Sequence, residues 1–237
     1  MITHSLDELL VFSGITLLFS ILGRVTRGVT ATGAVAGAVV CFAVLLAAGF
    51  GGFAGLFAVF VLTWAATRLG YERKRRIGLA EPRMGRTAAQ VVANLGIAAA
   101  CSLLYEFVWR DLRLLVCLAA ALSEAAADTV SSEIGKAFGG GASLITTWKP
   151  VPAGADGGVT LLGTLAGVSS AILIGLACAA GGMFLWQLAV VSAAAGVVGM
   201  MADSVLGATL ETRGILGNNA VNFLSTLIAA AVAFLAA

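Results

Sequence analysis

Hydrophobic residues form eight long stretches along the chain, separated by short polar or glycine-rich segments. An α-helix rises about 1.5 Å per residue, so roughly 17 to 25 apolar residues cross a hydrocarbon core of about 30 Å. The stretches cover residues 6–23, 30–48, 52–69, 87–108, 112–128, 158–180, 184–208 and 219–237. The pattern predicts an all-α, polytopic bundle of about eight transmembrane helices. The boundary between the second and third is the least defined, because only residues 49–52 separate them.

Composition supports an integral membrane protein. Of the 237 residues, 60% are hydrophobic and only 11% are charged, against about 25% charged residues in soluble domains. A soluble domain of this size could not bury nearly every segment from Leu9 onward. We therefore expect residues 1–237 to form a single integral membrane domain. Asp7 and Glu8 precede the first stretch, so it is not typical of a cleaved signal peptide. The net charge of +2 does not favour nucleic acid as a partner.

Lysine and arginine are concentrated in alternate connections. If both termini lie outside, the inner connections hold twelve of the fourteen cations: Arg24, Arg27, Arg68, Arg73, Lys74, Arg75, Arg76, Arg83, Arg86, Lys136, Lys149 and Arg213. The outer ones hold Arg110 and Arg113. Because short cytoplasmic loops retain Lys and Arg, we predict both termini outside, in the cytoplasmic membrane if the source is prokaryotic. The run 71–76 is then mainly a topology signal and a contact for anionic lipid. The longest polar stretches, 70–86 and 129–157, would face the cytoplasm, where soluble ligands bind.

Two acidic residues lie in or beside the fifth apolar stretch, where charge in contact with lipid is costly. Glu124 and Asp128 are four residues apart and therefore share one helical face, which Ser131 and Ser132 continue if the helix does. Two carboxylates on one face repel each other. A divalent cation or protonation would relieve this repulsion, and Mg²⁺ prefers carboxylate oxygens together with substrate phosphates. The spacing indicates a functional site.

Three other helices carry polar stripes near the same depth. These are Gly199, Asp203, Gly207 and Glu211 on the seventh, Arg86, Gln90 and Asn94 on the fourth, and Asn218, Asn219 and Asn222 on the eighth. Their convergence with Asp128 near the inner face favours a shared site. Buried amides also join membrane helices through hydrogen bonds. That structural interpretation stays open for Gln90 and Asn222.

The stretch 135–158 is rich in glycine, with Lys136 and Lys149 near its ends. Backbone N–H groups in glycine turns can bind anions, and lysine supplies a point charge for phosphate. The same composition also fits a flexible connection. The GxxxxGK[ST] phosphate-loop pattern is absent. Neither the scattered cysteines nor the single histidine, His4, forms a metal-binding or nucleophile motif.

Five segments together resemble the family of membrane kinases that includes plant phytyl-phosphate kinase. They are GRTAAQVVAN at 85–94, AADTVSSEIGKAFGG at 126–140, LITTWKPVPAGADGGVTLLGTLAG at 144–167, ADSVLGATLE at 202–211 and NNAVNFLST at 218–226. The resemblance implies phosphoryl transfer from a nucleoside triphosphate, with CTP favoured, to an isoprenoid monophosphate. It also suggests distant kinship to CTP-dependent phytol and dolichol kinases. One departure is that Leu95, not glycine, follows Asn94.

This resemblance gives the polar residues expected roles. Asp128 and Asp203 would hold Mg²⁺, with Glu133 and Glu124 as weaker candidates for ligands. Lys136, Lys149 and Arg86 would neutralise phosphate oxygens. Asp156 would orient water or ribose, and the nucleotide or phosphate would also contact Gly157, Gly158, Asn94, Asn218 and Asn222.

Two other function classes fit some of these features. A secondary transporter also carries intramembrane acids and helices interrupted by glycine. A CTP-dependent cytidylyltransferase acting on a lipid phosphate would share the substrates but would leave CMP on the product. The acids cluster toward one face and no internal repeat is visible, which favours the kinase over the transporter.

Overall fold

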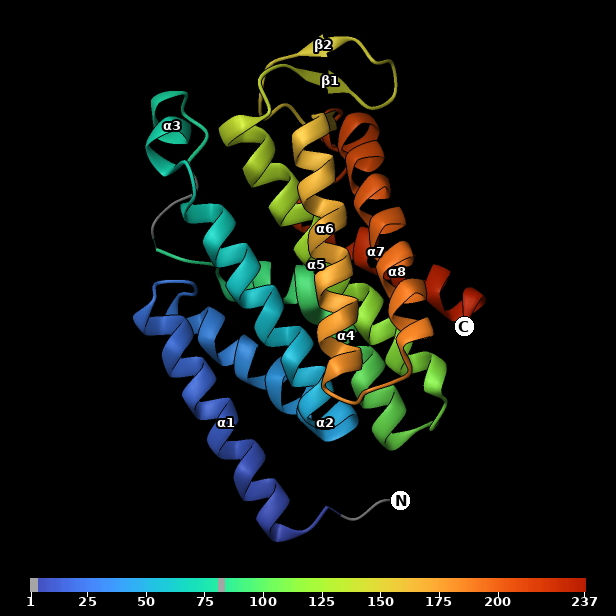
Figure 1. Cartoon of the computed structure of the whole chain (residues 1–237). Helices are drawn as coiled ribbons and strands as arrows, with labels where there is room; N and C mark the ends of the chain where they lie inside the picture. The colour runs from blue at the N-terminus through green and yellow to red at the C-terminus, as the bar shows by residue number, and fades with distance from the viewer. Residues whose placement is uncertain (1–3, 81–83) are drawn as a thin grey trace.

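In the computed structural model, which describes residues 4–80 and 84–237, the apolar stretches form long helices packed side by side (Figure 1). The helices are α1 (Leu6–Val25), α2 (Ala31–Arg68), α3 (Tyr71–Arg76), α4 (Ala88–Phe107), α5 (Leu112–Phe138), α6 (Leu161–Ala180), α7 (Trp186–Leu206), the π-helix η1 (Gly207–Glu211) and α8 (Asn218–Ala236). Within the described ranges, seven helices are long and apolar enough to cross a membrane. The predicted polytopic helical bundle is confirmed. Arg83, one of the expected inner cations, lies outside the described residues.

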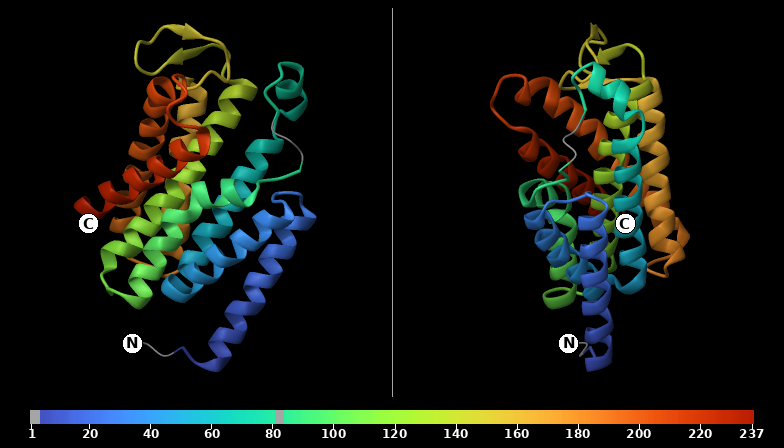
Figure 2. Two further views of the ribbon diagram at one scale, coloured as in Figure 1. Left: turned by 180° about the vertical axis from the view of Figure 1, so that it is seen from behind. Right: turned by 90° about the vertical axis from the view of Figure 1, so that its left-hand side faces the viewer.

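The difference between about eight expected spans and seven helices lies in α2. The expected spans 30–48 and 52–69 form one helical element that bends at Gly49, where φ is 55° and ψ is −144°. Figures 1 and 2 show the two halves of α2 meeting in a V. A side chain at Gly51 would collide with the backbone of Met183, so the bend packs closely against the connection between α6 and α7. Glycine thus allows both the bend and the close approach.

Helix α5 lies at the centre of the bundle and packs against α2, α4, α6, α7 and α8. Every residue from Leu114 to Ala127 is buried. Small residues permit this packing, since a Cβ added at Gly196 of α7 would meet the Ser123 Cβ at 2.6 Å and the Glu124 N at 2.9 Å. The acidic face of α5 is therefore enclosed by protein and does not contact lipid.

The polar stretch after residue 128 is more ordered than the sequence indicated. Helix α5 continues to Phe138, because Thr129, Val130, Glu133 and Ala137 remain buried against neighbouring elements. Three short strands follow, β1 (Ala142–Leu144), β2 (Pro150–Val151) and β3 (Gly158–Val159). They form an antiparallel sheet in the order β2-β1-β3, with Ala142 opposite Val151 and Leu144 opposite Gly158. The glycine-rich stretch is thus a small sheet.

The connections are divided between the two ends of the bundle. The short helix α3 and the three-stranded sheet lie at one end, and the N-terminus and the α4–α5 and α6–α7 connections lie toward the other (Figures 1 and 2). The end with α3 and the sheet holds most of the cations that were expected to face the cytoplasm. The direction of this end relative to the membrane and the single-domain organisation stay predictions.

Candidate active site

A cavity of about 1310 Å³ is lined by residues of α1, α2, α3, α4, α5 and α8 and of the connections between them. This volume exceeds the range of about 300–1,000 Å³ that is usual for small-molecule sites. Its polar lining includes Arg27, Arg68, Arg86, Asn94, Asp128, Lys136, Asn218, Asn219 and Asn222. Its apolar lining includes Phe19, Leu56, Val59, Phe60, Val91 and Leu95. One cavity therefore presents both charged groups and a hydrocarbon surface.

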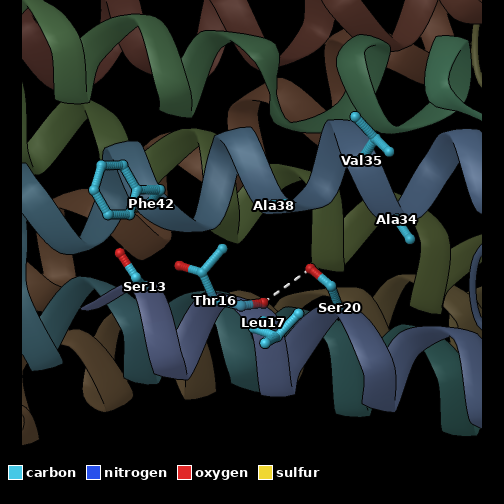
Figure 3. Close-up of a pocket in the computed structure, with 8 residues that line it drawn as sticks. All are labelled: Ser13, Thr16, Leu17, Ser20, Ala34, Val35, Ala38 and Phe42. Carbon is cyan, nitrogen blue, oxygen red and sulfur yellow. Dashed lines mark hydrogen bonds between the residues drawn. The ribbon is translucent and has the colours of Figure 1, made fainter. Parts of the chain in front are cut away.

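A second, smaller cavity of about 350 Å³ lies between α1 and the first half of α2 (Figure 3). Its lining is apolar apart from three hydroxyl groups, on Ser13, Thr16 and Ser20. The Ser20 hydroxyl donates a hydrogen bond to the Thr16 carbonyl at 2.9 Å, so it is already used within α1. No charged residue lines this cavity. It offers nothing that could bind a phosphate.

The carboxyl groups of Asp128 and Asp203 interact directly, although they come from helices α5 and α7. Asp128 lies in the wall of the large cavity, and Asp203 is not part of the lining. The Ser225 hydroxyl of α8 donates a hydrogen bond to Asp203 Oδ2 at 3.1 Å. The expectation that these two acids approach each other therefore agrees with the geometry. Two carboxylates held in contact inside a protein attract a cation or share a proton.

Glu124 lies one turn deeper on α5 and is only 1% exposed. It interacts electrostatically with both Asp128 and Asp203. Its Oε1 atom is buried and has no hydrogen-bond partner among the described residues. An acceptor without a partner is costly in a protein interior, and a bound cation would satisfy it.

At most two of these acids could bind the same metal ion. Within the described ranges, no group of three or more His, Cys, Asp or Glu is placed so that it could hold one. Mg²⁺ is usually held by one or two carboxylates together with substrate phosphates and water. A contacting Asp pair with an unsatisfied Glu124 beneath it suits that type of coordination.

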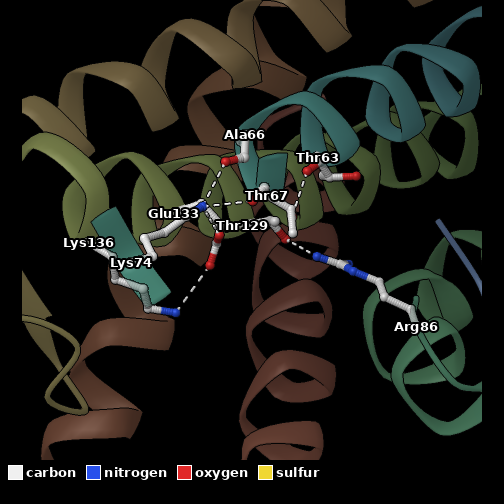
Figure 4. A network of polar contacts seen from close by, with 8 residues as sticks. All are labelled: Thr63, Ala66, Thr67, Lys74, Arg86, Thr129, Glu133 and Lys136. Atoms are coloured by element: carbon white, nitrogen blue, oxygen red, sulfur yellow. Dashed lines mark hydrogen bonds and ion pairs between the residues drawn. The ribbon is translucent and has the colours of Figure 1, made fainter. Parts of the chain in front are cut away.

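Two cations of the cavity lining, Arg86 and Lys136, interact with Asp128. Arg86 precedes α4 and donates a hydrogen bond from Nη2 to Thr129 Oγ1 at 2.9 Å (Figure 4). Lys136 lies two turns beyond Asp128 on α5 and contacts Glu133 Oε1 at 3.3 Å. Both interact electrostatically with Asp128. This arrangement of carboxylate between guanidinium and ammonium is suited to phosphate oxygens together with a metal ion.

The position of Arg86 is fixed by backbone contacts. Its N–H donates to the Gly28 carbonyl and its carbonyl accepts from the Thr30 N–H, both at 2.9 Å. Gly85 has φ of 82°, and a Cβ there would collide with the backbone of residues 27–29. A Cβ at Gly33 would overlap the Arg86 carbonyl oxygen. The connection between α1 and α2 thus holds Arg86 at the cavity.

We predict that Gly33→Ala shifts Arg86 and lowers turnover of a phosphate substrate by about tenfold, because small displacements of positioning groups cost that much or more. The overlap with backbone should also destabilise the protein by about 1–3 kcal/mol. Steady-state kinetics and thermal unfolding in detergent measure both effects. Gly14→Ala is the matched control, since a Cβ at Gly14 meets no atom within 4 Å. Equal behaviour of the two variants would contradict the assigned role of this contact.

A buried ion pair that the sequence did not reveal lies beside this site. Lys74 of α3 is 0% exposed, and its Nζ contacts Glu133 Oε2 at 2.5 Å (Figure 4). The same Nζ donates to the carbonyls of Ala66 and Thr67 at 3.1 and 2.9 Å. Glu133, expected as a weaker metal ligand, is therefore paired with two lysines, Lys74 and Lys136. The sequence contains one indication that Lys74 faces the protein. Tyr71 and Lys74 are three residues apart and share a helical face, and Tyr71 lines the cavity.

The asparagines meet as the sequence suggested. Asn222 Nδ2 donates to Asn94 Oδ1 at 3.4 Å, which joins α8 to α4. Asn94 also donates to the Gln90 carbonyl at 2.9 Å. Gln90 itself forms a capping box with Thr87 at the start of α4, which gives it a structural role. Asn94, Asn218 and Asn222 all line the cavity.

Four predicted site residues of the glycine-rich stretch lie outside the cavity lining: Lys149, Asp156, Gly157 and Gly158. Gly157 packs against Ala208 and the Ser204 carbonyl, where a Cβ would collide, and Gly158 pairs in β3. Asp156 is exposed. Glu211 of η1 interacts electrostatically with both Asp156 and Asp128. The Lys149 side chain is exposed. Asp156 and Gly157 therefore lie beside α7 and η1, whereas Arg86 and Lys136 line the cavity.

Comparison with known proteins gives a family and several relatives. The family described as integral membrane protein DUF92 matches residues 14–230. An uncharacterized membrane protein of Synechocystis sp. is 34% identical over 191 residues, which cover 79% of this chain and 74% of that protein. An uncharacterized membrane protein of Methanocaldococcus jannaschii is 34% identical over 201 residues, which cover 83% of this chain and 80% of that protein.

A plant relative is also similar over most of the chain. Protein VTE6, chloroplastic, of Arabidopsis thaliana is 32% identical over 233 residues, which cover 92% of this chain and 69% of that protein. No solved structure matches the chain. Together the matches confirm the family resemblance that the five sequence segments indicated.

Proposed function

The chain belongs to the DUF92 family of integral membrane proteins, and we propose that it is a membrane kinase acting on an isoprenoid monophosphate. It transfers the γ-phosphoryl group of a nucleoside triphosphate, CTP in preference to ATP, to the lipid phosphate. The product is an isoprenoid diphosphate. The site faces the cytoplasm, from which the soluble nucleotide arrives.

The single observation that carries this proposal is the mixed character of the large cavity. A lipid monophosphate has a doubly charged head and a hydrocarbon tail. The cavity lining pairs Arg86 and Lys136 with apolar residues from α1, α2 and α4. A substrate that was polar throughout would leave this apolar surface without a partner, and an apolar one would make no use of the positive charge at the other end of the cavity. The family relationship and the five motifs support the same substrate class.

Phosphoryl transfer depends on positioning and on stabilising charge. In the proposed reaction, an oxygen of the lipid phosphate attacks the γ-phosphorus. The bond between that phosphorus and the β,γ-bridging oxygen breaks, and the nucleoside diphosphate leaves. The attacking oxygen is already ionised near neutral pH, so no strong general base is required. The protein must therefore hold the lipid phosphate next to the γ-phosphate of the nucleotide, although both are negatively charged.

The acidic, basic and amide side chains have different roles in this reaction. Mg²⁺, when bound, neutralises phosphate charge, and Asp128 and Asp203 would hold it, with Glu124 beside them but outside the set of ligands. Arg86 and Lys136 offset the charge of the lipid phosphate from the cavity side. Asn94 and Asn222, joined to each other, offer amide groups to the same phosphate. Asp156, Gly157, Gly158 and Lys149 receive the nucleotide from the side of α7. Asn218 borders the cavity entrance at the start of α8.

The test is an assay of the purified protein in liposomes. Geranylgeranyl monophosphate, Mg²⁺ and γ-³²P-labelled CTP or ATP are supplied. The lipid products are separated, and their label and their masses are measured, the masses by mass spectrometry. A labelled diphosphate supports the kinase. A product that carries CMP, with release of pyrophosphate, would identify a cytidylyltransferase. Movement of substrate across the bilayer without a chemical change would identify a transporter, and no conversion with any donor would reject the proposal.

A further inference from the structure

The large cavity is deeper than a phosphate site requires. Along α5 its lining runs from Lys136 to Ala125, and along the second half of α2 it runs from Thr67 to Leu56. Eleven residues separate each pair, which corresponds to about 16 Å of helix. This distance is roughly half of the hydrocarbon core of a bilayer. Because protein interiors are normally close-packed, such a space marks a place for a ligand.

The chemistry of the lining changes with depth. Thr67, Arg86 and Lys136 lie at the shallow end, near the connections. Apolar side chains, Leu56, Val59, Val91 and Leu95, line most of the deep end, and Asn94 lies between the last two on α4. Apart from the amide pair of Asn94 and Asn222, a base, sugar or phosphate would find no hydrogen-bond partner among these deep side chains. A hydrocarbon chain attached to a phosphate fits both ends at once.

Two positions control the dimensions of the deep end, a tail compartment lined by Phe19, Gly37, Leu56, Val59, Phe60, Val91 and Leu95. Phe19 of α1 packs edge-on against Phe60 of α2, with ring centroids 5.4 Å apart. This contact closes the compartment on the α1 side. Gly37 lies in the first half of α2, and a Cβ added there meets no atom within 4 Å. A larger side chain at position 37 would therefore occupy cavity space without displacing backbone.

We propose that the tail compartment binds the isoprenoid chain of the acceptor and sets the chain length that the enzyme accepts, with Gly37 as the residue that keeps it open. The inference rests on the proposed function and adds the binding place of the tail. The apolar side chains give the tail an environment like that of the bilayer core, so it enters the protein without meeting unpaired polar groups. The phosphate then lies between Arg86 and Lys136.

The test replaces Gly37 with alanine, leucine or phenylalanine. For each variant, kcat/KM is measured with geranylgeranyl and with geranyl monophosphate, whose tails differ by two isoprene units. We expect Gly37→Phe to lower the ratio of the long to the short substrate by about tenfold or more, as filling a hydrophobic pocket does. Gly37→Leu should give an intermediate ratio, and Gly37→Ala a small shift in the same direction. If Gly37→Phe fails to fold, the ratios of the alanine and leucine variants still test the proposal.

The matched control is Gly14→Phe. Gly14 lies on the exposed face of α1 and also has no atom within 4 Å of an added Cβ, but it does not line the cavity. Its ratio should equal that of the wild type. Ratios that stay constant across the folded Gly37 variants would overturn the tail compartment while leaving the kinase intact. An inactive wild type would instead reject the kinase. A prenyl phosphate carrying a diazirine on its tail then tests the compartment separately, since its labelling of α2 and α4 should be lost in Gly37→Phe.

Discussion

Asp128→Asn is expected to lower turnover by at least about 100-fold, because even groups outside the first coordination sphere of a metal change activity by about 10- to 100-fold. The same substitution should leave the stability of the protein unchanged or raise it. Asp128 interacts with Asp203 and Glu124 in the protein interior, so although Arg86 and Lys136 lose an opposite charge, removal of one buried negative charge relieves both repulsion and desolvation. Asp203→Asn should behave in the same way. The rate of diphosphate formation and the midpoint of thermal unfolding in detergent measure the two effects.

The opposite directions of these two effects separate a catalytic role from a structural one. If the acids only joined α5 to α7, their neutralisation would reduce stability and activity together. Asp7→Asn is the matched control, since Asp7 is exposed in the first turn of α1, toward the opposite end of the bundle. It should change neither quantity. A fully active Asp128→Asn protein would remove this residue from the site.

Lys74→Met is expected to destabilise the protein by about 3–5 kcal/mol, which is the usual result of removing one partner of a buried ion pair. Lys74 is fully buried between Glu133 and two carbonyls at the end of α2. Its loss would leave the Glu133 carboxylate with only Lys136, at 3.3 Å. Since typical folding free energies are about 5–15 kcal/mol, such a change is a large share of the total. Thermal unfolding followed by circular dichroism measures it.

The double variant Lys74→Met with Glu133→Met distinguishes an isolated charge from lost packing. Replacement of both partners by apolar residues is often neutral, so the double variant should recover much of the lost stability. Lys149→Met is the matched control for stability alone, because the Lys149 side chain is exposed. If the double variant is as unstable as Lys74→Met, the effect comes from packing around α3 and not from the charge on Glu133.

Close helix packing explains how the acids can gather in a membrane domain. A Cβ at Gly199 of α7 would meet the Glu124 Cγ at 2.6 Å and the Ser225 carbonyl at 2.8 Å. Glycine at this position lets α7 and α8 approach α5 around the carboxylates. The π-helical turn η1 directly follows α7 and carries Glu211, and such turns are frequent at functional sites. The packing and the proposed chemistry therefore depend on the same stripe of small residues.

The sequence by itself determined the membrane character, the helical elements and the residues worth examining. Length and apolar content decide whether a segment can cross a bilayer, so spans such as 6–23 and 87–108 agree closely with α1 and α4. Periodicity decides which side chains share a face of one helix. The spacing of four residues therefore predicts that Glu124 and Asp128 share one helical face, and that Gly199 and Asp203 share another.

Only the tertiary structure decided which faces meet. Helix packing brought Asp128 to Asp203 and Asn94 to Asn222, and it placed Lys149 away from the cavity lining. The burial of Lys74 among a run of exposed cations depends on contacts with Glu133, fifty-nine residues later. The cavity is lined by residues of six helices at once. Periodicity describes one element, whereas these features arise from distances between elements, which no local pattern encodes.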